Sequence, residues 1–300
     1  MAVVNLQAMS KVCVGIDAGG THVRVRWAEG ELRTASAPDG GPEPAVALLQ
    51  QVPGEVLSVC AGITKISRGD TKERWEQALT RCCPAASVSV VPDYVVAFHG
   101  AIPEGAGILC VSGTGSVIYG ENGQGLSLRV GGRGWEFGDE GSGAAVTTEA
   151  LRRTLRACDG LWPHTALTKT ICEALATHEA ALVGERARQR ALKEGRGFLV
   201  HLIREQARAS NEEAVGLFTG AAGWLARYVR AAHEQLAFPP ESTVPVALVG
   251  GMWEQAGEWM QAPFWQLLER WDIAAVALNQ TGSPVEGALH LAERSVAVTR

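Results

Sequence analysis

The sequence has no Cys-x-x-Cys spacing, although it contains seven cysteines, and Cys82-Cys83 is its one adjacent pair. Zinc sites and thiol-redox motifs usually carry that spacing, so we expect neither. Cys13, Cys60 and Cys110 lie in apolar runs and are interpreted most simply as buried thiols. Thiols that stay reduced are typical of the cytoplasm, which is the compartment that we expect.

Other absences exclude further classes of function. No run of about 18 apolar residues could span a bilayer, and no early apolar stretch with a basic flank resembles a signal peptide. The net charge is −5 and no basic stripe stands out, so we expect neither nucleic acid nor a membrane as a partner. A Gly-Lys-Ser/Thr run is also missing, which excludes a Walker-type phosphate loop.

The composition that is present describes a globular protein. The chain has 300 residues, of which 46% are hydrophobic and 20% are charged, enough for one large domain or two of ordinary size. Glycine is abundant, with 35 residues, so many turns or close approaches of the backbone are expected.

A short stretch near the start predicts a β-hairpin with an acid at its tip. The apolar run from Val12 to Ile16 stops at Asp17, and Gly19-Gly20-Thr21 then leads into alternating apolar and polar residues. A glycine turn exposes backbone N–H groups that suit an anion. An ordinary tight hairpin fits this stretch equally well.

The same pattern occurs a second time. Ile108 to Val111 is apolar, Ser112-Gly113-Thr114-Gly115-Ser116 is the turn, and Val117 to Tyr119 resumes the strand. Each copy continues through a Glu-containing turn into a third strand. Internal repetition is more specific than either copy, and it predicts two related domains facing one another across a cleft. Two unrelated hairpins are the alternative.

The remainder of the chain alternates between helices and buried strands. Residues 160–212 are largely helical and show no chemistry, and residues 215–236 predict a long amphipathic helix. A buried strand over 244–249 runs into Gly250-Gly251, and the helix after it is expected to be interrupted near Pro263. Ser283-Pro284-Val285-Glu286 predicts a helix start.

These residues suit a magnesium nucleotide. Asp17 would hold Mg²⁺ through water, because magnesium uses one or two carboxylates and keeps several waters. The two glycine turns would grip phosphate oxygens. Phosphoryl transfer also needs a base for the acceptor, and Asp93, after Pro92 at a strand end, is the best candidate. In isolation, a turn-forming Pro-Asp is the preferred explanation of Pro92-Asp93.

Six motifs in order carry a family resemblance: Gly15-Ile16-Asp17-Ala18-Gly19-Gly20-Thr21, Pro92-Asp93, Val111 to Ser116, Gly138-Asp139-Glu140-Gly141-Ser142, Val249-Gly250-Gly251 and Ser283 to Ala288. The chain resembles the N-acetylglucosamine kinase family of the BadF/BadG/BcrA/BcrD-type ATPases, within the actin, Hsp70 and sugar-kinase superfamily. The resemblance implies an α/β fold of two actin-like, ribonuclease H-like domains that flank a nucleotide cleft. We expect the first over 1–118 and the second over 119–300, with a helical insertion in the second and the last helix packing back on the first.

The resemblance also implies roles for individual residues. ATP would be held by Gly19, Gly20, Thr21, Gly113, Thr114, Gly115, Ser116, Gly250, Gly251, Gly287 and Ala288, the last four beside the adenosine, where absent side chains leave room. The sugar would lie against Gly62, Thr64, Asp93, Thr114, Gly132 and Asp139, with Asp93 as general base and Asp17 as the Mg²⁺ anchor.

Two departures from the family bear on the sugar. Relatives carry a sugar-contacting asparagine where this chain has Asp39-Gly40-Gly41-Pro42, and a relative's tryptophan is replaced here by Arg133, with Trp135 two positions later. They leave the identity of the sugar open.

The expected activity is transfer of the ATP γ-phosphate to the 6-hydroxyl of N-acetylglucosamine or glucosamine by a protein that forms a homodimer. The alternative within the family is an ATPase activator of a radical dehydratase, which holds an iron–sulfur cluster through cysteines; the scattered cysteines here do not favour it. A chaperone-like module would need a client-binding region, and none is left over. A kinase of the repressor-and-kinase family would carry a cysteine-rich zinc motif, which is missing.

Overall fold

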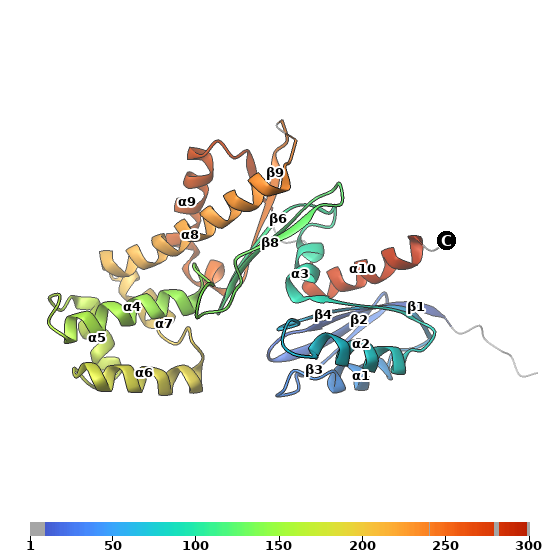
Figure 1. Ribbon diagram of the computed structural model, residues 1–300, viewed down its shortest axis with the longest axis horizontal. Helices are drawn as coiled ribbons and strands as arrows, with labels where there is room; N and C mark the ends of the chain where they lie inside the picture. The colour runs from blue at the N-terminus through green and yellow to red at the C-terminus, as the bar shows by residue number, and fades with distance from the viewer. Residues whose placement is uncertain (1–9, 240, 279–281, 299–300) are drawn as a thin grey trace, which may run out of the picture. The chain divides into compact units, whose positions relative to one another are not determined.

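The computed structural model describes residues 10–239, 241–278 and 282–298, and it divides the chain into two compact units (Figure 1). Unit 1 combines residues 10–105 with 282–298, and unit 2 comprises residues 106–278. The sequence led us to place a domain boundary after residue 118, which lies inside strand β7 (Ser116–Asn122) of unit 2.

Unit 1 is built on a five-stranded sheet in the order β3-β2-β1-β4-β5. Its strands are β1 (Lys11–Ala18), β2 (His22–Trp27), β3 (Gly30–Ala35), β4 (Glu55–Ile63) and β5 (Ser87–Pro92). The first three are antiparallel, whereas β1, β4 and β5 are parallel. Its helices are α1 (Glu43–Leu49), α2 (Thr71–Cys82), α3 (Asp93–Ala101) and α10 (Pro284–Val298).

Strand β1 is buried on both faces, because helices cover both sides of the sheet (Figure 1). Val14 and Ile16 point into a core shared with α1 and α2, where Trp75 and Leu79 are buried. Helix α10 packs against the opposite face. There a Cβ on Gly15 would lie 2.2 Å from the backbone nitrogen of Leu289, so only glycine allows this helix to approach.

Unit 2 repeats this topology, with the sheet order β8-β7-β6-β9-β10. Its strands are β6 (Ala106–Ser112), β7 (Ser116–Asn122), β8 (Ser127–Val130), β9 (Val244–Val249) and β10 (Ala275–Leu278). Strands β6, β7 and β8 are antiparallel, and β6, β9 and β10 are parallel, as in unit 1. The repeat that the two glycine hairpins predicted therefore extends to the whole sheet, and the α/β fold class is confirmed.

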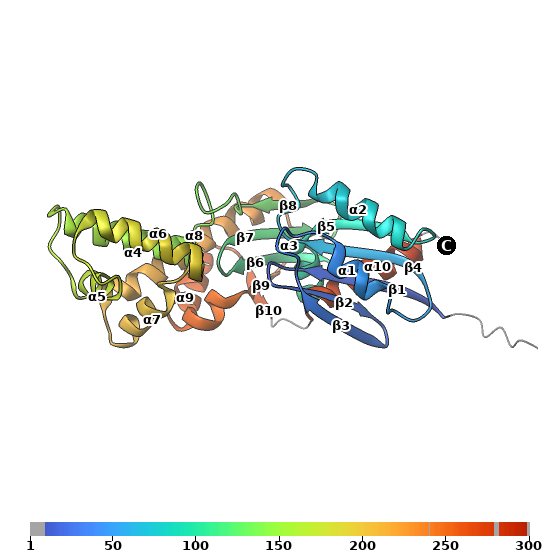
Figure 2. The same cartoon turned by 90° about the horizontal axis from the view of Figure 1, so that it is seen from below.

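The helices of unit 2 are α4 (Gly143–Cys158), α5 (Ala166–Ala174), α6 (Ala180–Glu194), α7 (Val200–Arg208), α8 (Glu212–Leu236) and α9 (Gly251–Arg270). Helices α4 to α7 gather at one end of this unit (Figure 2). Helix α8 is the predicted amphipathic helix, and Asn211 caps it by accepting from two backbone N–H groups.

Helix α9 runs without a break from Gly251 to Arg270, with Pro263 inside it. The predicted interruption near Pro263 is therefore wrong. A proline removes one hydrogen bond and disfavours a helix interior, but buried side chains on both sides of it, Met260 and Phe264, hold the two halves against the core of unit 2. Among the described residues, no helix is both long and apolar enough to cross a bilayer.

Candidate functional site

Three of the predicted site positions meet at one edge of the sheet of unit 1. Asp17 pairs with Gly62 across β1 and β4, and the next residue after β5 is Asp93. The three strands are parallel, so their carboxyl ends lie side by side. Ligands of open α/β sheets bind at this edge. Thr64 is fixed there too, since its N–H donates to the carbonyl of Ala18 at 3.1 Å.

The two carboxylates of this edge influence one another. Burial raises the pKa of Asp17 to about 6, the nearby Arg24 opposes the shift, and the charge of Asp93 adds to it. Burial also raises the pKa of Asp93, against hydrogen bonds from the Tyr94 N–H, at 2.9 Å, and from the Thr64 side chain. Buried acids of this kind are found where a cation or a proton is handled.

Beside them, the β1–β2 turn offers open backbone. Gly19 closes the turn by donating its N–H to the carbonyl of His22 at 3.0 Å. A Cβ on Gly20 would meet nothing within 4 Å, so its main chain is accessible from outside. Thr21 is exposed at the tip. This turn has the open main chain that an anion needs.

In unit 2, the β6–β7 turn is held by the loop 131–143. Ser112 and Ser116, at the two ends of the turn, donate from Oγ to the carbonyls of Gly141 and Glu140, both at 2.7 Å. In return, the N–H groups of residues 143 and 144 donate to the carbonyls of residues 113 and 114. The turn and the loop are therefore one structure, and a Cβ on Gly113 would meet nothing within 4 Å.

Asp139 is the most constrained residue of that loop. Its φ is +58°, a conformation that few residues other than glycine adopt, and its Oδ1 accepts from the Gly134 N–H at 3.2 Å. A Cβ on Gly115 would lie 2.8 Å from Oδ2, so this carboxylate faces the glycine turn. Burial, Glu140 and Glu136 raise its pKa. Gly132 packs against the same hairpin, where a Cβ would lie 2.9 Å from Val117.

The glycine pairs expected beside the adenosine have packing roles of their own. Gly250 has φ +111°, and a Cβ there would lie 2.4 Å from the carbonyl oxygen of Ser112. A Cβ on Gly287 would lie 2.0 Å from the carbonyl oxygen of Val96, and Ala288 is fully buried. A Cβ on Gly62 would likewise strike Val96. The room that the missing side chains leave at 62, 250 and 287 is filled by protein; Gly251, which begins α9, is more open.

One contact in unit 2 was missed from the sequence. The Arg196 guanidinium lies 3.5 Å from the ring centroid of Trp135, so the segment between α6 and α7 reaches the loop 131–143. A Cβ on Gly197 would also contact Gly143, at 3.6 Å. The interruption Gly195-Arg196-Gly197 between two helices was the available signal. The predicted residues thus form two groups, one in each unit.

The doubled topology places the chain among the actin-like folds, as predicted. The model of the BadF/BadG/BcrA/BcrD ATPase family matches residues 14–262, and the chain belongs to this family.

Three curated relatives are kinases of amino sugars. An N-acetyl-D-glucosamine kinase of Dictyostelium discoideum is 29% identical over 80% of this chain and 76% of its own. The glucosamine kinase of Vibrio cholerae is 27% identical over 90% and 96%. An N-acetylmuramic acid/N-acetylglucosamine kinase of Clostridium acetobutylicum is 29% identical over 55% of this chain, and the match spans 60% of that relative's length.

Solved structures share the fold. A candidate N-acetylglucosamine kinase from Chromobacterium violaceum superposes with a TM-score of 0.68, at 24% identity over 93% of this chain and 98% of that one. A second, from Porphyromonas gingivalis, has a TM-score of 0.63 at 16% identity over 94% and 99%.

Proposed function

We propose that this protein is a kinase that transfers the γ-phosphate of ATP to the 6-hydroxyl of an amino sugar, N-acetylglucosamine or glucosamine. Membership in an ATPase family supports the use of ATP, and the curated relatives are kinases of these sugars. The single observation that carries the proposal is the edge of the unit 1 sheet, where the candidate metal anchor Asp17 near the end of β1 and the candidate base Asp93 directly after β5 lie at the carboxyl ends of parallel strands on either side of β4.

Asp93 is the proposed general base. Its carboxylate would accept the proton of the sugar hydroxyl as the oxygen attacks phosphorus, so that no alkoxide has to form in water. The Thr64 side chain and the Tyr94 N–H hold the carboxylate in place, and burial raises its pKa toward the range in which a base is effective.

Asp17 is the proposed anchor for the magnesium of Mg-ATP. The donor set fits this ion, because one buried carboxylate with a raised pKa is stabilised by a cation, and magnesium keeps most of its waters. Among the described residues there is no cluster of three or more His, Cys, Asp or Glu side chains placed to hold a metal. The bound ion would neutralise charge on the phosphates.

The open turns would take the phosphate oxygens: Gly19, Gly20 and Thr21 in unit 1, and Gly113 to Ser116 in unit 2. The nucleotide base and ribose would contact Gly250-Gly251 and Gly287-Ala288, a role that rests on the family resemblance. The sugar would contact Gly62 and Thr64 in unit 1, and Thr114, Gly132 and Asp139 in unit 2. A homodimer, also implied by the family, is tested by light scattering on the purified protein.

The test is an ATP-coupled assay with glucosamine, N-acetylglucosamine, N-acetylmuramic acid, N-acetylmannosamine and glucose. We expect phosphorylation of glucosamine or N-acetylglucosamine and, in Asp93→Asn, a loss of at least about a hundredfold in kcat with ATP binding retained. Asp70→Asn, at an exposed carboxylate of the same unit with no proposed role in the site, is the matched control. ATP hydrolysis without phosphorylation of any sugar would contradict the proposal and favour the dehydratase activator, as would an iron signal in anaerobically purified protein.

A further inference from the structure

Two cysteines of unit 2 lie in contact. The Sγ atoms of Cys158, the last residue of α4, and Cys172, on α5, are 3.7 Å apart. We propose that Cys158 and Cys172 are a dithiol modification site, which a hydroperoxide oxidises to a disulfide that fastens α4 to α5. This proposal is independent of the kinase function.

The positions of the two thiols suit this reaction. Cys172 is fully buried in the core of unit 2, whereas Cys158 is half-buried at a helix end. The chain between them contains an exposed turn, in which the side chains of Leu161 and Trp162 are 69% and 52% exposed. Bond formation requires the two sulfurs to close from 3.7 Å to about 2.05 Å, which side-chain rotation and a small movement at this helix end can supply.

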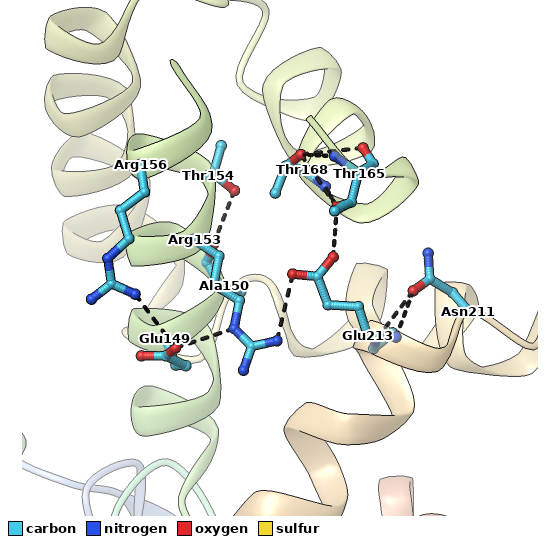
Figure 3. A network of polar contacts seen from close by, with 10 residues as sticks. Glu149, Ala150, Arg153, Thr154, Arg156, Thr165, Thr168, Asn211 and Glu213 are labelled. Carbon is cyan, nitrogen blue, oxygen red and sulfur yellow. Dashed lines mark hydrogen bonds and ion pairs between the residues drawn. The ribbon is translucent and has the colours of Figure 1, made fainter. Parts of the chain in front are cut away.

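A carboxylate links the two helices that carry the thiols. Glu213, at the start of α8, accepts from Arg153 of α4 at 3.5 Å and from Thr165, the N-cap of α5, at 2.5 Å (Figure 3). Arg153 lies five residues before Cys158, and Thr165 lies seven residues before Cys172. Glu213 therefore links α4 to the N-terminus of α5, and holding the two helices that carry the thiols in place favours an intramolecular reaction.

The chemistry assigns different roles to the two sulfurs. Burial and the neighbouring Cys158 raise the pKa of the Cys172 thiol, and Cys158 is the more exposed of the two, so Cys158 is the sulfur that meets the oxidant. The Cys158 sulfur attacks one peroxide oxygen and becomes a sulfenic acid, while the O–O bond breaks and the thiol proton leaves with the other oxygen as water. The Cys172 sulfur then attacks the Cys158 sulfur, and a second water leaves with the thiol proton. The dithiol loses two electrons and two protons, and the peroxide gains them.

The other thiols do not offer such a pair. Cys82 and Cys83 are neighbours in the chain, and Cα atoms across one trans peptide are about 3.8 Å apart, below the roughly 4.4 Å that ordinary disulfides need. Burial raises the pKa values of Cys60, to about 11, and of Cys110. The structure describes all seven cysteines. Among them, Cys158 and Cys172 are the one sequence-distant pair whose Sγ atoms lie within hydrogen-bonding distance.

The test treats the reduced full-length protein with hydrogen peroxide, blocks free thiols and digests without reductant. Trypsin cuts after Arg156, Lys169 and Arg186, so each cysteine of the pair lies in its own peptide, 157–169 or 170–186. We expect the blocked thiols to fall from seven to five, with these two peptides linked and then released by dithiothreitol.

Variants separate the proposal from general oxidation. Cys158→Ser or Cys172→Ser should abolish the link, and Cys83→Ser should retain it. Glu213→Gln should slow its formation about two- to fivefold, the range expected for a partly exposed ion pair, whereas Glu205→Gln on α7 should not. Sulfinic acid at Cys158 without a linked peptide, or a link that joins other cysteines, would overturn the proposal.

Discussion

Replacing Asp17 with asparagine should stabilise the protein while it disables the proposed metal site. Asparagine has the same shape, but it places no charge in the buried edge of unit 1. In the wild type this charge is unfavourable, because burial raises the pKa of Asp17 from 3.8 to about 6. The proposed function therefore requires a charge that the fold alone does not favour, a conflict common at active sites.

The size and pH dependence of this effect follow from linkage. A carboxyl whose pKa is raised in the folded state costs nothing below pH 3.8, where it is protonated in both states, and costs the full amount above pH 6. At about 1.36 kcal/mol for each pKa unit, the shift corresponds to about 2–3 kcal/mol. Asp17→Asn should gain that amount at pH 7.5 and little at pH 4.

The assay is urea denaturation of the wild type and Asp17→Asn at both pH values, with chelator present and without nucleotide. Added Mg-ADP should then stabilise only the wild type. Asp39→Asn is the control of opposite sign: Arg74 and the Gly41 N–H lower the pKa of Asp39, so its loss should destabilise the protein slightly at pH 7.5. If Asp17→Asn is less stable than the wild type at pH 7.5, or gains equally at both pH values, the electrostatic account of this edge is refuted.

Three further predictions concern the packing at Gly287, the cap of α4 and the stack of Arg196 on Trp135. Gly287→Ala should destabilise the protein by more than about 2 kcal/mol in urea denaturation, because its Cβ would strike the Val96 carbonyl; a neutral substitution would contradict that packing. Ser142→Ala should cost about 1 kcal/mol, because the Ser142 Oγ caps α4 by accepting from the Ala145 N–H; equal midpoints would refute the cap. Arg196→Gln should raise the KM for the sugar about two- to fivefold with little change in kcat, because it removes the stack on Trp135, worth about 0.5–1 kcal/mol. An unchanged KM would show that this contact does not contribute to sugar binding.

Local patterns predicted much of the fold because the strands here are short, apolar and bounded by glycine turns. The two hairpins at Asp17 and Gly113 were enough to predict the doubled topology. The close approach of the backbone at Gly287 was not predicted, because a missing side chain does not reveal which neighbour uses the space. Val96 uses it, and it is almost two hundred residues away in the chain.

Contacts between segments that are distant in the chain could not be predicted from the spacing of residues in the sequence. Cys158 and Cys172 are separated by a turn and part of a helix, so their separation matches no motif, and only the packing of α4 on α5 brings the sulfurs together. Arg196 likewise meets Trp135 because a helical segment folds back on a loop. The roles proposed for the site residues stay predictions.

The discontinuity of unit 1 has a consequence for synthesis. Strand β1 ends at residue 18, but the helix that covers one of its faces begins at residue 284. At about 5–20 residues per second, the ribosome needs on the order of tens of seconds to supply α10 after β1 has emerged. During that interval unit 2 can complete its own sheet, whereas the apolar face of β1 around Gly15 stays exposed because α10 has not yet been synthesised. We expect nascent chains halted before residue 284 to expose this face to chaperones, and full-length chains to bury it.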